Sequence, residues 1–205
     1  MLKDLQRAAK VNQEGASLLE LGDTSKALKC FRSSLKLVNE CCQKGLAHKL
    51  PTKGLNAALL GSTPVRLSRS SGEEEFYSQV FDFDPEGKVT VQKQSYCSAV
   101  LIFNCALALH QKGYTQWETE KNYSAYTKAL LFYSQALNLL RPFTETPECF
   151  QIIQEIMKNQ ADIYYKINDL GNVQRVMEEL VHLAKERQGS GSAELRPNTR
   201  IASTA

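Results

Sequence analysis

The chain has 205 residues, of which 42% are hydrophobic and 23% are charged, and its formal net charge is +3. This composition is typical of a globular protein with one substantial core, and so weak a charge does not by itself indicate nucleic-acid binding. The longest apolar stretch, residues 99–109, is interrupted by Asn104 and is far shorter than the roughly 20 residues that span a bilayer.

The first predicted element is a pair of helices over residues 3–43. Apolar residues recur at three- and four-residue steps on both sides of Gly22-Asp23-Thr24. Glycine ends helices, and Asp or Thr begins them. We therefore expect a helix, a tight turn and a second helix, which together make a helical hairpin.

A long insert, residues 44–95, comes next. Its first part, residues 44–69, carries lysines and arginines but no acidic residue, and Gly, Pro and Ser interrupt it as in a loop. Alternating apolar residues around a Pro-and-Gly turn predict a small β-hairpin over residues 80–91. The three acidic residues of that turn, Asp82, Asp84 and Glu86, lack the spacing of a calcium-binding loop, so we expect them to be solvated.

The insert also holds three candidate phosphorylation sites, because serines follow arginines there and precede a run of acids. A phosphate would add close to two negative charges beside that run. The candidate residues are Ser68, Ser70 and Ser71.

Two further hairpins are predicted over residues 96–140 and 148–187. The first helix of the earlier pair is expected to stop at Gly113, and the later pair turns at residues 168–172. Four aromatic residues lie within the second hairpin: Tyr114, Trp117, Tyr123 and Tyr126. They either pack two extended helices together or form an exposed tip that binds a partner. Residues 188–205 open with Gly-Ser-Gly-Ser, which is typical of a flexible linker, and are expected to lie outside the fold.

The three hairpins share an order of small, turn-forming, small and large residues. Two helices approach closely only where one side chain is small, and a large residue then fills the remaining space. In register, the sets are Gly15, Gly22, Ala27 and Phe31; Ala106, Gly113, Ala129 and Tyr133; and Ala161, Asn168, Val173 and Met177. This pattern resembles the tetratricopeptide repeat, most clearly over residues 12–37. The resemblance implies an all-α fold over residues 1–187, in which three antiparallel helical hairpins stack as a short superhelix.

The resemblance also implies a protein-binding function. In tetratricopeptide proteins, the concave face of the first helices binds extended peptides or helices. By register, that face carries Asn12, Ala16, Leu19 and Glu20; Phe103, Leu107, His110 and Gln111; and Lys158, Asp162, Tyr165 and Lys166. Phe103 and Leu107 either form the apolar centre of this groove or belong to the core beneath the insert.

Nothing in the sequence predicts catalysis, a cofactor or a metal site. The six cysteines form no Cys-x-x-Cys pair, the three histidines lack metal-ligand spacing, and no nucleophile or phosphate-binding motif is present. With no apolar leader at the N-terminus, we expect reduced thiols in the cytoplasm or nucleus. We therefore expect a non-enzymatic scaffold or adaptor. The alternative is an accessory module that binds nucleic acid or an anionic membrane through residues 44–69.

Overall fold

The computed structural model describes residues 2–46, 64–65, 80–85, 90–115 and 121–191. Within this part of the chain, the structure is dominated by α-helices, as predicted. They are α1 (Leu2–Glu20), α2 (Thr24–Leu46), α3 (Val91–Thr115), α4 (Lys121–Leu140), α5 (Pro147–Lys166) and α6 (Leu170–Gly191). Two short strands, β1 (Pro64–Val65) and β2 (Val80–Phe81), lie between α2 and α3, and a 3-10 turn, η2 (Arg141–Phe143), follows α4.

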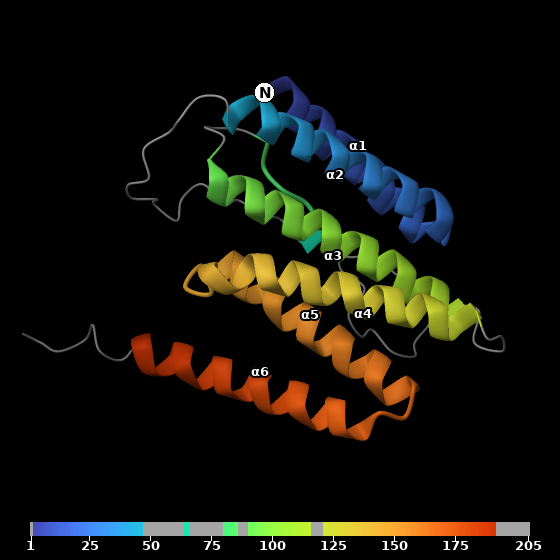
Figure 1. Cartoon of the computed structure of the whole chain (residues 1–205), viewed down its shortest axis with the longest axis vertical. Helices are drawn as coiled ribbons and strands as arrows, with labels where there is room; N and C mark the ends of the chain where they lie inside the picture. Colours follow the sequence, from blue (N-terminus) through green and yellow to red (C-terminus); the bar gives the residue numbers. More distant parts are fainter. Residues whose placement is uncertain (1, 47–63, 66–79, 86–89, 116–120, 192–205) are drawn as a thin grey trace, which may run out of the picture.

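The helices pack against one another in chain order (Figure 1). α1 packs on α2, α2 on α3, α3 on α4, α4 on α5, and α5 on α6. The pairs α1–α2, α3–α4 and α5–α6 are the three predicted hairpins. No helix in the described residues combines the length and the apolar character needed to cross a membrane.

The first and third hairpins turn by the same local chemistry. Gly22 has a φ of 79° and Asn168 a φ of 60°, the left-handed conformation that ends a helix. The next residue is an aspartate in both turns, and its carboxylate begins the following helix. Asp23 accepts a hydrogen bond from the backbone N–H of Lys26, and Asp169 accepts one from the backbone N–H of Asn172. The predicted turns are confirmed at both places.

Gly113 has a different role from the one predicted, because α3 continues through it to Thr115. A Cβ atom at Gly113 would lie 2.6 Å from the ring of Tyr126 in α4. Gly15 in α1 is related in the same way to Phe31 in α2, also at 2.6 Å. Both glycines therefore provide room for a buried aromatic ring of the partner helix, whereas Gly22 marks a turn.

The two ends of the predicted β-hairpin over residues 80–91 have other partners, and its residues 86–89 lie outside the described part of the chain. β2 pairs with β1 in antiparallel register, with Pro64 opposite Phe81 and Val65 opposite Val80. Thr90 instead caps α3, because its hydroxyl oxygen accepts a hydrogen bond from the backbone N–H of Lys93 at 3.1 Å. Val91 is therefore the first residue of a helix, which begins five residues earlier than the predicted 96.

The C-terminal hairpin differs from the prediction at two points. Val176 is buried, whereas Met177, the predicted inward residue, is 43% exposed. α6 also runs to Gly191, beyond the predicted boundary at residue 187. Glycine and serine lower helix propensity by about 1 kcal/mol or less per residue, so a helix can continue through them where their backbone keeps a helical conformation, as α6 does to Gly191.

Candidate functional site

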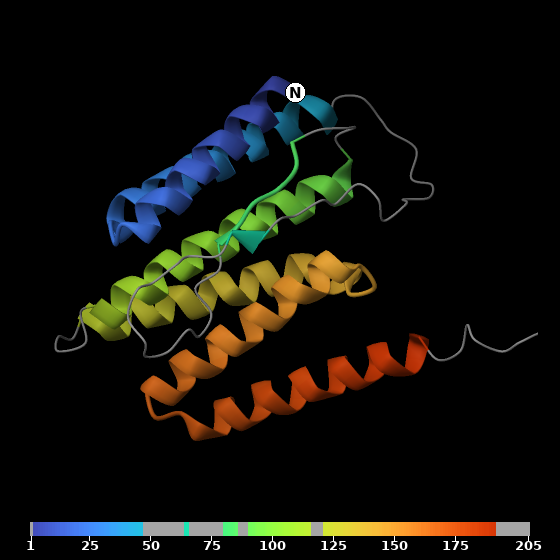
Figure 2. The same cartoon turned by 180° about the vertical axis from the view of Figure 1, so that it is seen from behind.

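The first helices of the three hairpins, α1, α3 and α5, carry the predicted site residues, and we call their common side the helix-A face. Between α1 and α3 this face holds a segment of the chain itself, residues Val80–Phe83 (Figure 2). Val80 and Phe81 are fully buried, and Phe83 is 2% exposed. The segment is extended, and side chains of the helices bind its backbone.

Asn104 in α3 binds both backbone groups of one residue of this segment. Its Oδ1 accepts a hydrogen bond from the N–H of Phe81 at 3.1 Å, and its Nδ2 donates to the carbonyl oxygen of Phe81 at 2.8 Å. Asn104 is completely buried. β2 also pairs with β1, and the amide of Asn104 supplies the N–H and C=O of Phe81 with the partners that buried backbone groups need.

Two residues of α1 complete the polar contacts. Asn12, also completely buried, donates from Nδ2 to the carbonyl oxygen of Phe81 at 3.0 Å and to Oδ1 of Asp82 at 3.3 Å. Gln13 donates from Nε2 to Oδ2 of Asp82 at 2.6 Å. Asn12 is itself oriented by Asn104, whose Nδ2 donates to Oδ1 of Asn12 at 2.8 Å.

The apolar centre of the helix-A face lies beneath this segment. The ring of Phe81 meets the ring of Phe103 edge to face, with centroids 5.2 Å apart. Phe103 is 0% exposed and Leu107 is 2% exposed. Phe103 and Leu107 were expected either to form the apolar centre of an open groove or to belong to the core. They belong to the core, beneath a segment of the insert.

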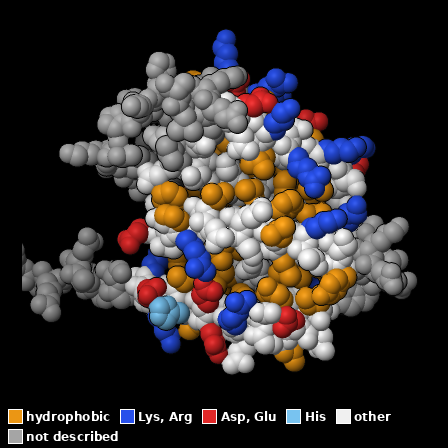
Figure 3. All heavy atoms as spheres, viewed as in Figure 1, with side chains coloured by type: hydrophobic (Ala, Val, Ile, Leu, Met, Phe, Trp, Pro, Cys, Tyr) orange, Lys and Arg blue, Asp and Glu red, His pale blue; other side chains and the backbone are white. Residues whose placement is uncertain are grey.

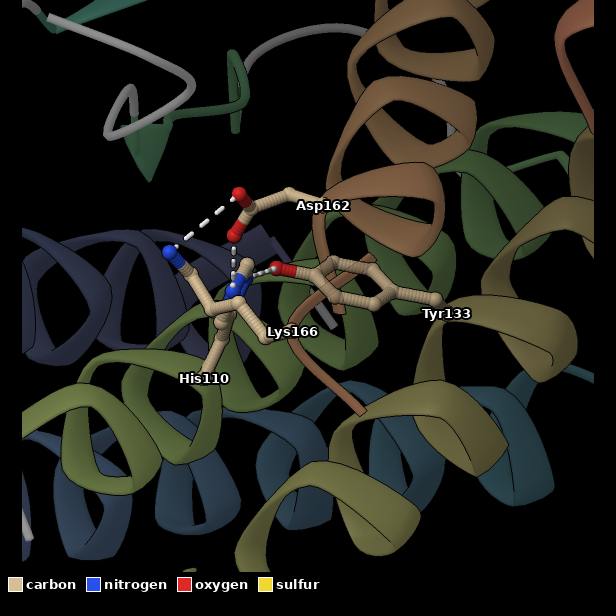
Figure 4. A network of polar contacts seen from close by, with 4 residues as sticks. All are labelled: His110, Tyr133, Asp162 and Lys166. Atoms are coloured by element: carbon tan, nitrogen blue, oxygen red, sulfur yellow. Dashed lines mark hydrogen bonds and ion pairs between the residues drawn. The ribbon is translucent and has the colours of Figure 1, made fainter. Parts of the chain in front are cut away.

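A second group of site residues meets where α3, α4 and α5 come together (Figure 4). His110 of α3 contacts Asp162 of α5 through Nε2 and Oδ2 at 2.9 Å, and Lys166 lies 3.4 Å from the other oxygen of Asp162. The hydroxyl of Tyr133 in α4 lies 3.5 Å from Nδ1 of His110. Lys166 also lies over the ring of Tyr114, with Nζ 4.7 Å from the centroid.

The electrostatics of this second group favour a charged Asp162 and neutral tyrosines. Burial raises the pKa of Asp162, but the hydrogen bond and charge of His110 and the charge of Lys166 outweigh it, so the pKa lies below its ordinary value. Burial raises the pKa of Tyr133 well above its ordinary value and that of Tyr126 to about 12.

An aspartate, a histidine and a hydroxyl in series are a known arrangement for activating a nucleophile. Here the hydroxyl belongs to Tyr133, which is fully buried at the contact between helices. A substrate would have to reach this oxygen through the core. The arrangement is therefore better suited to joining three helices than to a reaction.

Leu19, Lys158 and Tyr165 do not belong to either group. Leu19 is 2% exposed and lies in the core, whereas Tyr165 is 68% exposed. Lys158 forms an ion pair with Glu155 at 3.2 Å. Tyr114 and Tyr123 of the predicted aromatic tip are 47% and 64% exposed, whereas Tyr126 is buried. The serines at 68, 70 and 71, Trp117, and nearly all of the basic insert 44–69 lie outside the described residues.

One other surface feature bears on possible partners. Lys and Arg side chains gather where α1 and α2 lie, at the upper right of Figure 3. The exposed cations of α2 include Lys26, Lys29, Arg32 and Lys36. No cluster of three or more His, Cys, Asp or Glu side chains that could hold a metal ion occurs in the ranges that the structure describes.

The sequence interpretation missed the residues that bind the extended segment. It assigned Asn12 to the helix-A face, gave no such role to Gln13 or Asn104, and expected Asp82 to be a solvated turn residue, whereas Asp82 accepts hydrogen bonds from Asn12 and Gln13. One signal for Asn104 was available, since this asparagine alone interrupts the apolar stretch 99–109. A polar side chain inside such a helix must find a buried partner.

Comparisons with models of protein families, with curated proteins and with solved structures found no match to this chain.

Proposed function

We propose that this protein is a non-enzymatic adaptor, built from tetratricopeptide-like hairpins, that binds an extended segment of a partner protein on its helix-A face. The observation that carries the proposal is the binding of Val80–Phe83 by Asn12 and Asn104. We further propose that it acts in the cytoplasm, where its cysteines stay reduced.

The physical support comes from which groups are recognised. Asn12 and Asn104 make three hydrogen bonds to backbone atoms of Phe81, and these atoms are the same in every residue except proline. Such contacts fix the path of a chain and leave sequence preference to neighbouring side-chain contacts. Extended peptides are bound in this way in other recognition sites, where backbone bonds give affinity and pockets give specificity.

The test is a selection of random peptides, displayed on phage, on the immobilised full chain. Selected peptides are then synthesised, and their affinities are measured by fluorescence anisotropy. Asn104→Ala should weaken binding by about tenfold or more, because it removes two backbone contacts from a buried site. Circular dichroism checks that this variant is folded, and Asn12→Ala serves as a milder second variant.

Leu131→Ala is the matched control, since this apolar residue of α4 is 57% exposed and belongs to neither group of site residues. Its affinity for the selected peptides should equal that of the unaltered chain. The proposal fails if no peptide is enriched, or if the enriched peptides bind the folded Asn104→Ala and Asn12→Ala chains as tightly as the unaltered chain.

A further inference from the structure

The Val80–Phe83 segment is bound to the helices in the manner of a ligand. It belongs to no helix, and its strand pairing within the described residues is limited to the two residues of β1. The surrounding helices contact one another directly, α1 with α2, α2 with α3, and α3 with α4. Asp84, which follows the segment, is exposed. The helical framework therefore has its own contacts that do not pass through this segment.

The side-chain contacts give the segment a definite chemistry. Val80, Phe81 and Phe83 are all buried, with Phe81 against the ring of Phe103. Between the two aromatic residues, the carboxylate of Asp82 accepts hydrogen bonds from Gln13 and from the backbone N–H of Phe83. The helix-A face between α1 and α3 therefore accommodates an order of apolar, aromatic, acidic and aromatic residues.

The preference for an acid at the third position follows from the orientation of one amide. Oδ1 of Asn12 accepts a hydrogen bond from Asn104, so Nδ2 of Asn12 points toward the segment, where it donates to the carbonyl oxygen of Phe81 and to Oδ1 of Asp82. An N–H donor fixed in this direction favours a carboxylate. A lysine or arginine in place of Asp82 would bring its own N–H donors against this one, and the hydrogen bond from Asn12 would be lost.

We propose that the face between α1 and α3 is a binding site for extended protein segments of the type apolar–aromatic–Asp–aromatic, and that Val80–Phe83 occupies it as an intrachain ligand. This inference rests on the proposed function and narrows its partner class. A partner segment of this type replaces Val80–Phe83. Its apparent affinity is lowered in proportion to the small fraction of molecules in which the site is empty.

The probe is a fluorescent peptide with the sequence of residues 80–85, Val-Phe-Asp-Phe-Asp-Pro. It is titrated into the full chain carrying Phe81→Ala, a change that weakens the resident segment and replaces no residue of the helices. Anisotropy should show saturable binding that is about tenfold or more tighter than to the unaltered chain, because the competing segment no longer fills the site.

Three controls locate the binding. Asn104→Ala added to Phe81→Ala should lower the affinity for the peptide by about tenfold. Replacing the first Asp of the peptide by Lys should lower the affinity by a similar factor. Leu131→Ala added to Phe81→Ala should leave the affinity unchanged, since this side chain is exposed on α4. Phe83→Ala is the second chain variant, and it takes the place of Phe81→Ala if circular dichroism shows that the latter is unfolded.

The inference is overturned if the folded variant shows no saturable binding of the peptide, or if binding is indifferent to Asn104 or to the Asp of the peptide. It is equally overturned if both Phe81→Ala and Phe83→Ala unfold the helices, because the segment would then be an inseparable part of the core. Selected phage peptides of other chemistry that still depend on Asn104 would leave the proposed function standing while this inference falls.

Discussion

Replacing Gly15 by alanine tests the closest approach between α1 and α2. A Cβ atom at this position would lie 2.6 Å and 2.8 Å from two ring carbons of Phe31 and 3.1 Å from Cβ of Cys30. Phe31 is completely buried, so its ring has no free space into which to move. The added methyl group must therefore separate the two helices or force Phe31 into a strained rotamer.

The expected loss of stability is the difference between two opposing effects. Overpacking a well-packed core costs about 1–3 kcal/mol. Alanine is more favourable than glycine inside a helix by about 0.5–1 kcal/mol. Because the clash is with a rigid buried ring, the first effect is larger, and we expect a net destabilisation of about 1–2 kcal/mol. For a chain of this size, the melting temperature should fall by about 2–8 °C.

The assay is urea and thermal unfolding followed by circular dichroism. Gly171→Ala is the matched control, since a Cβ atom there has its nearest neighbour at 3.9 Å, and it should leave stability unchanged or increase it. Adding Phe31→Leu to Gly15→Ala should cost less than the sum of the two single changes, because the smaller side chain makes room for the methyl group. A Gly15→Ala chain as stable as the unaltered one, with additive effects in the double variant, would refute the assigned packing.

Three further predictions concern the packing of the first hairpin and the residues at and beside Asp162. Ala27→Leu, at a fully buried position of α2, should lower the free energy of unfolding by about 1–3 kcal/mol in urea titrations, and an unchanged midpoint would contradict the packing of the first hairpin. The folded-state pKa of Asp162 is depressed, so its contribution to stability is present above the ordinary carboxyl pKa of about 4 and is lost as pH falls through the lower folded value. Stability curves measured from neutral to acid pH should therefore be less steep in the acid range for Asp162→Asn, and equal slopes would be the contrary result. Lys166→Glu should lower the melting temperature because it places a second carboxylate beside Asp162, whereas Tyr165→Ala, at a side chain that is 68% exposed, should leave it nearly unchanged; equal melting temperatures for the two variants would contradict this assignment.

The helices and two of their turns follow from local sequence. Apolar spacing at three and four residues determines which face of a helix is buried, whatever it packs against. Gly22-Asp23 ends one helix and begins the next through contacts within a few residues, and Asn168-Asp169 does the same. Such contacts involve near neighbours in the chain, so they can be recognised without knowledge of the tertiary structure.

The role of Gly113 could not be predicted from local sequence. Glycine can end a helix or allow another element to approach it closely, and the residue itself is the same in both cases. The choice at Gly113 depends on Tyr126, which lies across the hairpin in α4. Similarly, an alternation of four residues before Gln92 is consistent with a strand, but the cap at Thr90 begins a helix there.

The candidate site depends almost entirely on long-range contacts. Asn12 and Asn104 are 92 residues apart in the chain, and Phe81 is 69 residues from the first and 23 from the second. The amino-acid pattern alone shows that Asn104 is a polar residue within an apolar helix, and such a residue must find a buried partner. That this partner is the backbone of Phe81 depends on the tertiary arrangement, in which α1 and α3 lie on either side of the segment. A buried hydrogen bond needs both groups at one point in space, and periodicity along a helix carries no information about which distant segment will arrive there.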